Sequence, residues 1–510
     1  MRHTMNGKMK QFLTTSSNSL IAFLLIYFLV TLYFWDGIGP RDAEQYITAA
    51  LSWRETGAYL GESHWSLRYL LVLPMAFFFT VFEPSEFLAS TPNILYGALL
   101  VVVTFYYSRR HLGMIAGNIF TLLIATSAFY TIQAAELRIY GVEIFYVVLS
   151  LWLFIEGTSS ARPNSRILFL AGLMAGGAWL CRESTIFLPL AIGAAALIMK
   201  GPFFRATIPA ALGYLTVLIV EFALYRFAAG NFLYRYMIDL GHGGDTPGTK
   251  IGGPVESQSL FDYIAHPFIE LVSYPSVSPF VFIGVIALIY LLRGGVFCKT
   301  ARRIVAIFGL GAVLSFVISG YPLSLEYVEY YPIVCYISLL VTSIAIASLY
   351  ERSGKIASGL ATVMVVALSF TVADFRDYDE YSEARLLTDL VLAYDEPIFS
   401  DNITVNRATS LLRLRGVTDE KAQALLRRGD TIPNGVLVYQ AIPRGARYPI
   451  VSSPTWVEIE RSYPRDPSWT KFILRKIIPV SVRTPRLSEI LQPPKPVILY
   501  RTPSAITKTQ

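Results

Sequence analysis

"SLIAFLLIYFLVTLYFW", Ser19–Trp35, is followed almost at once by "GPRDAEQYITAALSWRETG", Gly39–Gly57. The first stretch is long enough to cross a membrane, because a crossing needs about 20 apolar residues and roughly 17 at least. The second stretch carries acids, yet its apolar residues keep helical spacing: Ala43, Tyr46, Ile47, Ala50 and Leu51. Together they predict a membrane helix followed by a half-apolar helix at the membrane surface.

The composition is that of a membrane protein with some soluble mass. Of 510 residues, 54% are hydrophobic and only 15% are charged, and the mean hydropathy is +0.49. A soluble domain has roughly a quarter charged residues. The net charge of +7 is expected from basic cytoplasmic turns, so no nucleic-acid partner is predicted.

The three cysteines, Cys181, Cys298 and Cys335, are scattered in or beside apolar segments. They form no disulfide framework and no metal-binding spacing. The first apolar run follows "MRHTMNGKMK", and no small-residue cleavage site comes after it. We therefore interpret it as an uncleaved span with the N-terminus in the cytoplasm.

Further apolar runs predict a polytopic helical domain. The expected spans lie near residues 19–35, 87–107, 114–132, 139–155, 167–180, 185–199, 206–227, 272–292, 304–319, 331–349 and 356–372. One more run, Ser66–Phe82, is short and contains Pro74. We predict about eleven spans, with Ser66–Phe82 lying on or dipping into the outer leaflet.

The distribution of Lys and Arg indicates whether Ser66–Phe82 crosses the membrane. If Ser66–Phe82 does not cross, the short inner turns carry Arg109, Arg110, Arg162, Arg166, Lys200, Arg205, Arg293, Lys299, Arg302, Arg303, Arg352 and Lys355. The longer outer segments then hold Arg41, Arg54, Arg68, Arg138, Arg182, Arg235 and Lys250. Counting Ser66–Phe82 as a crossing would move the first set outside, against the positive-inside rule.

Two outer segments are large: a first loop, 37–86, and a Gly/Pro-rich loop, 228–271, that we expect to be mobile. The helical membrane part ends near residue 373. Residues 374–510 are charged and proline-rich, with strand-like runs "PIFSD", "GVLVYQ" and "PVILYR". They predict a small soluble α/β domain, which the topology places outside the cytoplasm.

Ionisable side chains gather at the predicted outer turns: Asp42, Glu44, Glu136, Arg138, Arg182, Glu183, Glu326 and Glu329. Basic groups at headgroup depth suit a lipid phosphate, and acids beside them suit proton transfer from a hydroxyl. The pattern indicates a site that joins a lipid-borne phosphate to an extracytoplasmic acceptor. Each group also has a simpler interpretation: Asp42 could cap its helix, the arginines could bind ordinary headgroups, and Glu136 could pair with Arg138.

Three stretches resemble the C-type (GT-C) membrane glycosyltransferases, and among them the group of protein O-mannosyltransferases and lipid A aminoarabinose transferases, family 39. "RDAEQYITAALSWRETGAYLGESHWSLRYLL" is similar to the first outer loop of the family, and "AELRIYGVEIFYVVLSLWLF" to its Glu-Ala-Arg-Pro-Tyr signature. "AGLMAGGAWLCRESTIFLPLA" resembles its glycine-rich helix that ends at a basic residue, here Arg182.

The resemblance implies a GT-C-like catalytic membrane domain over residues 1–373, which transfers a sugar from a polyprenyl-phosphate donor to a hydroxyl of an extracytoplasmic glycan, lipid or protein. It implies Asp42 as general base with Glu44 second, and Arg138 and Arg182 as ligands of the donor phosphate. It implies that substrate also contacts Glu136, Tyr140 and His64. Inversion at the anomeric carbon follows from one base and one face of attack.

Some residues depart from the family pattern. Ala43 separates acids that are often adjacent, and His64 is followed by Trp-Ser where the family has Pro-Pro. The segment before residue 331 lacks the usual Arg, which shifts the phosphate contacts onto Arg138 and Arg182. No spacing supports a metal site, although a divalent cation could take part.

Two other classes remain open. A lipid or solute transporter or flippase would place ionisable groups at mid-membrane, where only Glu221 and Glu143 are expected. A non-catalytic assembly protein would tolerate loss of Asp42. The glycosyltransferase interpretation ranks first, in a bacterial inner membrane.

Overall fold

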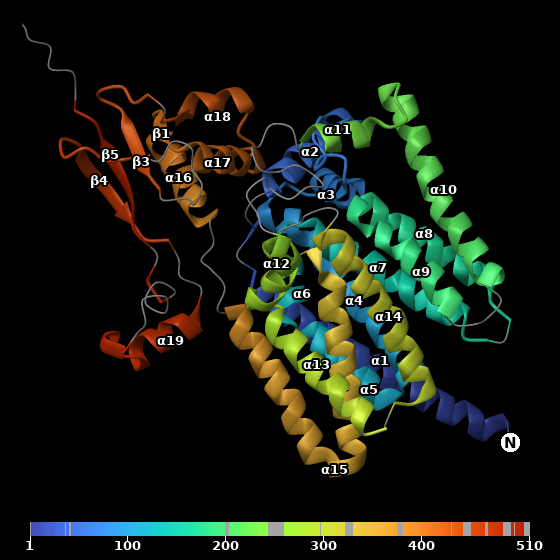
Figure 1. Ribbon diagram of the computed structural model, residues 1–510. Helices are drawn as coiled ribbons and strands as arrows, with labels where there is room; N and C mark the ends of the chain where they lie inside the picture. Colours follow the sequence, from blue (N-terminus) through green and yellow to red (C-terminus); the bar gives the residue numbers. More distant parts are fainter. Residues whose placement is uncertain are drawn as a thin grey trace, which may run out of the picture. The chain divides into compact units, whose positions relative to one another are not determined.

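The computed structural model describes residues 2–35, 37–39, 42–160, 162–198, 203–242, 260–295, 297–321, 330–374, 381–429, 431–441, 450–464, 468–482, 491–493 and 495–503 (Figure 1). These residues are mostly helical, with one small sheet. Glu326, Glu329 and most of the Gly/Pro-rich stretch of the loop 228–271 lie outside them.

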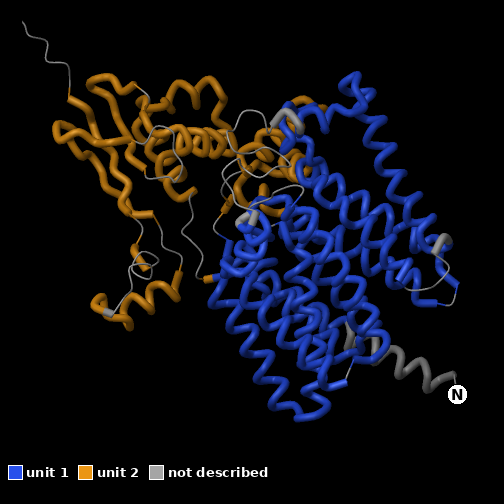
Figure 2. The backbone as a smooth tube through the Cα atoms, in the orientation of Figure 1, with its two compact units in different colours: residues 1–35, 60–74, 92–373 blue, residues 36–59, 75–91, 374–510 orange. Residues whose placement is uncertain are grey.

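The chain forms two compact units (Figure 2). Unit 1 comprises residues 1–35, 60–74 and 92–373, and unit 2 comprises residues 36–59, 75–91 and 374–510. The first outer loop is therefore divided: its start clusters with the C-terminal part, and residues 60–74 cluster with the helices of unit 1.

Apolar helices make up unit 1. Those wholly within it are α1 (Arg2–Tyr33), α5 (Met114–Ala125), α6 (Ala128–Ala135), α7 (Ile139–Gly157), α8 (Ser165–Cys181), η1 (Glu183–Ile186), α9 (Phe187–Ile198), α10 (Phe203–Ala229), α11 (Tyr234–His242), α12 (Leu260–Ser273), α13 (Ser278–Arg293) and α14 (Lys299–Gly320). Three more extend to or across the unit boundary, α3 (Tyr69–Val81), α4 (Glu86–Leu112) and α15 (Pro332–Asp374).

Within the described residues, five helices are long and apolar enough to cross a membrane, or seven if each of two bent pairs is one span. The pairs are α5 with α6, bent by 47°, and α12 with α13, bent by 96°. Helix α15 contains two of the predicted spans, separated where Gly354 adopts a φ of +85°. Helix α3, in the run Ser66–Phe82 that is predicted not to cross, is one of the shorter apolar helices. The total of eleven spans stays a prediction.

Small residues bring α8 and α10 into close contact. A Cβ at Gly172 would collide with the carbonyl oxygen of Ala210, and one at Gly213 with the carbonyl oxygen of Phe169. Such small-residue interfaces let membrane helices approach closely and gain van der Waals contact. The glycine-rich stretch therefore forms a seam between the two helices.

Unit 2 contains a mixed five-stranded sheet of order β2-β1-β3-β5-β4. Its elements are α2 (Ala43–Thr56), α16 (Tyr381–Tyr394), β1 (Ile398–Ser400), α17 (Asn402–Leu414), α18 (Asp419–Leu425), β2 (Leu426–Arg428), β3 (Leu437–Gln440), β4 (Val457–Ser462), α19 (Trp469–Ile477), η3 (Val480–Val482) and β5 (Val497–Arg501). The predicted strand runs thus form β1, β3 and β5. Strand β1 is parallel to β2 and β3, whereas β5 is antiparallel to β3 and β4.

Ion pairing ties the early segments of unit 2 to its C-terminal part. The Arg385 guanidinium donates to both Glu86 carboxylate oxygens, with Nε at 2.9 and 3.0 Å and Nη2 at 2.6 Å. The backbone N–H of Ile38 donates to the same carboxylate at 3.3 Å. Gly37, at φ +97°, lies so close that a Cβ there would collide with both Arg385 and Glu86. Asp401 caps α17 by accepting from Ile403 N and Thr404 N, each at 2.9 Å.

Candidate functional site

A buried guanidinium lies at one end of unit 1, where α8 ends and α7 begins. Arg182 has extended backbone between α8 and η1, and it is only 6% exposed. Its Nη1 lies 3.5 Å from Glu143 Oε2 on α7. Its Cζ lies 5.1 Å from the ring centre of Tyr140 and 4.0 Å from that of Tyr330. The structure therefore brings together two predicted site residues, Arg182 and Tyr140, and adds Glu143 and Tyr330.

Electrostatics keep Arg182 charged. Burial lowers the pKa of a guanidinium, but Glu143, Tyr140 and Tyr330 together more than offset this, and the net pKa of Arg182 is raised. Stacking over two aromatic rings adds favourable cation–π contact. Arg182 is therefore not a surface cation reaching for headgroups, as the simpler interpretation held, but a cation enclosed by protein.

Glu136 and Arg138 lie just before α7 and pair with each other. Arg138 Nε is 2.6 Å from Glu136 Oε2, and both side chains are about four-fifths buried. The amide of Asn93 on α4 fixes this turn, because its Nδ2 lies 2.9 Å from the Glu136 carbonyl and 2.5 Å from that of Arg138. The ion pair between Glu136 and Arg138 that the sequence allowed is therefore present.

A second buried cation, Arg235 on α11, was not among the predicted site residues. It is 2% exposed and pairs with Glu183, with Glu221 at 2.9 Å and with Asp239 at 4.0 Å. It also donates to the Trp179 carbonyl at 3.2 Å. This cluster joins α11 to α8, η1 and α10. The sequence signal for it was an isolated outer arginine with an acid four residues later.

The pKa of Asp239 is strongly shifted in this cluster of charges. Burial, and then the charge of neighbouring Glu183, raise the pKa of Asp239 from 3.8 to about 8, against the lowering effect of Arg235. Arg68, 9% exposed, acts on the same acid and on Glu143 and Arg182. The sequence predicts Arg68 only as an outer charge, whereas the structure makes it part of this buried charge network.

The loop that carries Arg68 also contains His64. The His64 ring lies 3.9 Å from the ring of Trp65. Near the start of this segment, the Gly61 carbonyl accepts from the Tyr234 hydroxyl at 3.2 Å. His64 thus belongs to unit 1 together with the arginines, whereas Asp42 and Glu44 belong to unit 2.

Asp42 and Glu44 begin α2 in unit 2. Asp42 occupies the N-cap position, but its side chain makes no capping hydrogen bond. The interpretation of Asp42 as a capping carboxylate is therefore not supported. Glu44 is half-buried, and its pKa is raised, mainly by burial, with Asp42 adding to the shift and Arg407 opposing it.

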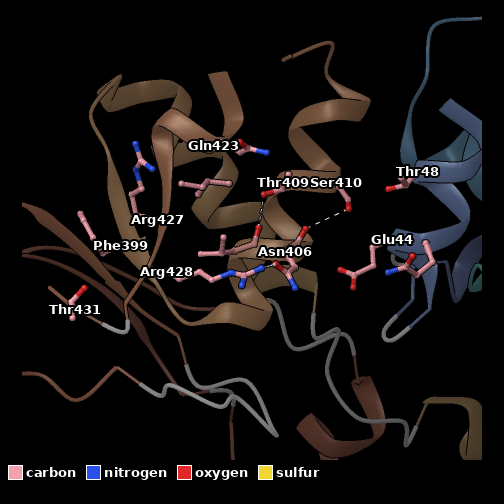
Figure 3. A pocket seen from close by; sticks show the side chains of 13 residues that line it. Glu44, Thr48, Phe399, Asn406, Thr409, Ser410, Gln423, Arg427, Arg428 and Thr431 are labelled. Carbon is pink, nitrogen blue, oxygen red and sulfur yellow. Dashed lines mark hydrogen bonds between the residues drawn. The ribbon is translucent and has the colours of Figure 1, made fainter. Parts of the chain in front are cut away.

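Glu44 faces a polar cavity of about 690 Å³ inside unit 2 (Figure 3). Its lining comes from α2, β1, α17, α18 and β2 and from Thr431: Glu44, Gln45, Thr48, Phe399, Val405, Asn406, Thr409, Ser410, Gln423, Leu426, Arg427, Arg428 and Thr431. Arg428 Nη2 donates to Asn406 Oδ1 at 3.2 Å, and Arg413 Nη1 to Thr48 Oγ1 at 3.2 Å. Amides, hydroxyls and guanidinium groups therefore converge on one hollow with a single carboxylate.

The family described as dolichyl-phosphate-mannose-protein mannosyltransferase matches residues 70–225. This range contains Glu136, Arg138, Tyr140 and Arg182, and Asp42 and Glu44 precede it.

Two structures of one solved protein support the fold with TM-scores of 0.53 and 0.50. The chain is similar to ArnT from Cupriavidus metallidurans in the apo state, with 13% identity and a TM-score of 0.53 over 83% of this chain and 93% of that one. The same protein bound to undecaprenyl phosphate matches with 13% identity and a TM-score of 0.50 over 82% and 92%. The Archaeoglobus fulgidus oligosaccharyltransferase matches with 12% identity and a TM-score of 0.46 over 85% and 60%. No curated protein matches significantly. The predicted resemblance to the C-type membrane glycosyltransferases is confirmed.

Proposed function

We propose that this protein transfers a sugar from a polyprenyl-phosphate carrier to a hydroxyl group of an extracytoplasmic glycan, lipid or protein. The observation that carries the proposal is Arg182, a buried guanidinium where α8 ends and α7 begins, in the range that matches the dolichyl-phosphate-mannose-protein mannosyltransferase family. The fold likeness to ArnT, solved with undecaprenyl phosphate, supports the same class.

The donor phosphate binds at Arg182 and Arg138. A guanidinium offers five N–H donors, and Glu143 contacts Arg182 through one nitrogen at the long distance of 3.5 Å. Charge grows on the carrier phosphate as the glycosidic bond breaks, and a preorganised cation in a dry site stabilises that charge strongly. Tyr140 and Glu136 position the sugar or the arginines, and His64 contributes to substrate binding. The leaving group is a stable phosphate and needs no general acid.

The acceptor hydroxyl gives its proton to Asp42, with Glu44 as the second candidate. The Asp42 side chain makes no capping hydrogen bond to α2, which is consistent with this role. A raised pKa suits a carboxylate that must accept a proton near neutral pH, and Glu44 has one. The cavity beside Glu44 has the amides, hydroxyls and arginines that bind polyhydroxylated groups, and we assign it to the acceptor. Attack on one face inverts the anomeric carbon.

The proposed setting is the inner membrane of a bacterium. The chain crosses it several times, the N-terminus is cytoplasmic, and the domain 374–510 is extracytoplasmic. Basic turns such as Arg109–Arg110 then face the cytoplasm, as the positive-inside rule requires.

The decisive experiment measures transfer by the purified protein in nanodiscs. Radiolabelled polyprenyl-phosphate sugars are offered with an envelope extract, and the wild type is compared with Asp42→Asn and Arg182→Gln; Arg461→Gln, an exposed arginine in unit 2, serves as the matched control. Transfer that needs the lipid carrier and collapses in both site variants supports the proposal. Transfer that survives Asp42→Asn moves the base to Glu44. A folded protein that transfers nothing from any carrier refutes the proposal and favours a transporter.

A further inference from the structure

Unit 1 has a cavity of about 930 Å³ that the proposed transfer does not use. It lies between α4, α5, α7 and α8, and its walls are mostly apolar, with Val102, Tyr106 and Leu149 among them. Tyr106 and Met114 are exposed at its edge. Glu156, at one end of the cavity, lies 16 residues after Tyr140 on the same helix, about 24 Å along its axis. The cavity is therefore separate from the Arg182 site.

The same end of the cavity is basic. Arg109 and Arg110 line it together with one acid, Glu156. That acid is already engaged, since Arg110 Nη2 lies 2.6 Å from one carboxylate oxygen and His111 Nε2 lies 3.0 Å from the other. Arg303, which donates to the Thr158 carbonyl at 2.7 Å, adds positive charge beside His111. The end of the cavity thus has more positive than negative charge.

Arg109 is held in place without a counter-ion. Its Cζ lies 4.6 Å from the ring centre of Phe105. Its backbone packs so closely on Gly117 of α5 that a Cβ there would lie 2.6 Å from the Arg109 nitrogen. In the described part of the chain, no salt bridge joins Arg109 to an acid, and its buried Nη1 has no hydrogen-bond partner. A half-buried cation without a counter-ion costs folding free energy, and a bound anion would remove this cost.

We propose that this cavity binds an anionic phospholipid, with its phosphate on Arg109 and Arg110 and an acyl chain along Val102, Tyr106 and Leu149. An apolar channel that ends in two guanidinium groups matches an amphiphile with a phosphate head. Guanidinium groups bind phosphate through paired hydrogen bonds. The basic turn belongs to the face that is predicted to meet the cytoplasmic leaflet, where anionic lipids gather.

Native mass spectrometry in mild detergent tests the assignment on the full-length protein. Phosphatidylglycerol, phosphatidylcholine, undecaprenyl phosphate and inorganic phosphate are titrated separately. Wild-type protein is expected to retain one phosphatidylglycerol and to bind it more tightly than the other three. Because Arg109 has no ion-pair partner to lose, Arg109→Gln is expected to fold normally and to bind phosphatidylglycerol about tenfold more weakly.

Two further variants separate head from tail. Val102→Trp fills the apolar channel without changing charge and is also expected to weaken binding, whereas Arg352→Gln removes an arginine elsewhere in unit 1 and is expected to have no effect. Equal affinity for phosphatidylglycerol and phosphatidylcholine would overturn the proposal. So would full retention of the lipid by Arg109→Gln, tighter binding of undecaprenyl phosphate, or displacement of the lipid by inorganic phosphate. None of these outcomes depends on sugar transfer, so this proposal and the proposed function fail separately.

Discussion

Replacing Arg182 with methionine tests whether the buried pair with Glu143 holds unit 1 together or serves a ligand. Glu143 is 2% exposed, so Arg182→Met leaves a carboxylate in a dry site without its cation. Breaking one side of a buried pair destabilises a protein by about 3–5 kcal/mol. The two aromatic contacts, at 4.0 and 5.1 Å, are lost as well. We expect Arg182→Met to be less stable by about this amount.

The double variant Arg182→Met, Glu143→Gln separates stability from function. It removes both charges, and replacing a buried pair with uncharged residues is often neutral or even stabilising by about 1–4 kcal/mol. Its free energy of unfolding should therefore return close to that of the wild type. Sugar transfer should stay low in both variants, because neither can hold the carrier phosphate. The loss expected for removing one such stabilising group is about 100-fold to 1,000-fold.

The assay is equilibrium unfolding in mixed micelles, followed by the fluorescence of the seven tryptophans, together with carrier-dependent transfer. Arg461→Met is the control, since its pair with Glu458 is exposed and such pairs contribute about 1 kcal/mol or less. If Arg182→Met unfolds like the wild type, the reasoning about a buried charge pair is wrong. If the double variant recovers transfer along with stability, Arg182 is structural and does not bind the phosphate.

Three further predictions follow from the described contacts. The pKa of Asp239 is about 8 in the folded protein, compared with an ordinary value of 3.8, so its contribution to stability is fully present below about pH 4 and is lost as the pH rises towards 8. Asp239→Asn should therefore make the melting temperature less dependent on pH over this range. If the variant keeps the pH dependence of the wild type, the assignment is wrong. Asn406→Ala, which removes an amide from the Glu44 cavity and the partner of Arg428, should raise KM for the acceptor several-fold while leaving KM for the donor unchanged; Thr431→Val, at the far wall, is the milder comparison. Glu86→Gln weakens its three contacts with Arg385 and should lower the stability of unit 2 by about 1–3 kcal/mol, measured by thermal unfolding; no change would indicate that water replaces the bond at no cost.

Much of the fold could be predicted from the sequence, because apolar length and helical spacing are local properties. The surface helix at Ala43, the strand near Ile398 and the helix from Ile139 all follow from such patterns. The break at Gly354 was predictable as well, because the charged stretch around it separates the two expected spans at 331–349 and 356–372.

The candidate site was only partly predictable. Arg182 stands out as a charge in a very tight outer turn, whereas Tyr140 was predicted only through the resemblance to the family's Glu-Ala-Arg-Pro-Tyr signature. The burial of Arg68 and Arg235 depends on how residues 60–74 and α11 pack on the other helices, which no local pattern reports. The cavity at Glu44 depends on Asn406 and its neighbours, more than 350 residues away along the chain, so no local pattern predicts it.

The close contact of α8 with α10 at Gly172 and Gly213 has a consequence for how the charged end of unit 1 can vary. Arg182 lies ten residues beyond Gly172 on α8 and its short extension, about 15 Å along the axis, and Glu221 lies eight residues beyond Gly213 on α10. Because the two backbones are in direct contact here, no flexible side chains lie between the helices that could adjust to a change in spacing. An added methyl group at this contact would therefore push the two helices apart and shift the acids and arginines at their ends. A different substrate preference would therefore evolve more easily by changing the residues around Arg182 than by changing this seam. The contact between α8 and α10 is fixed, and it sets the positions of the residues around Arg182.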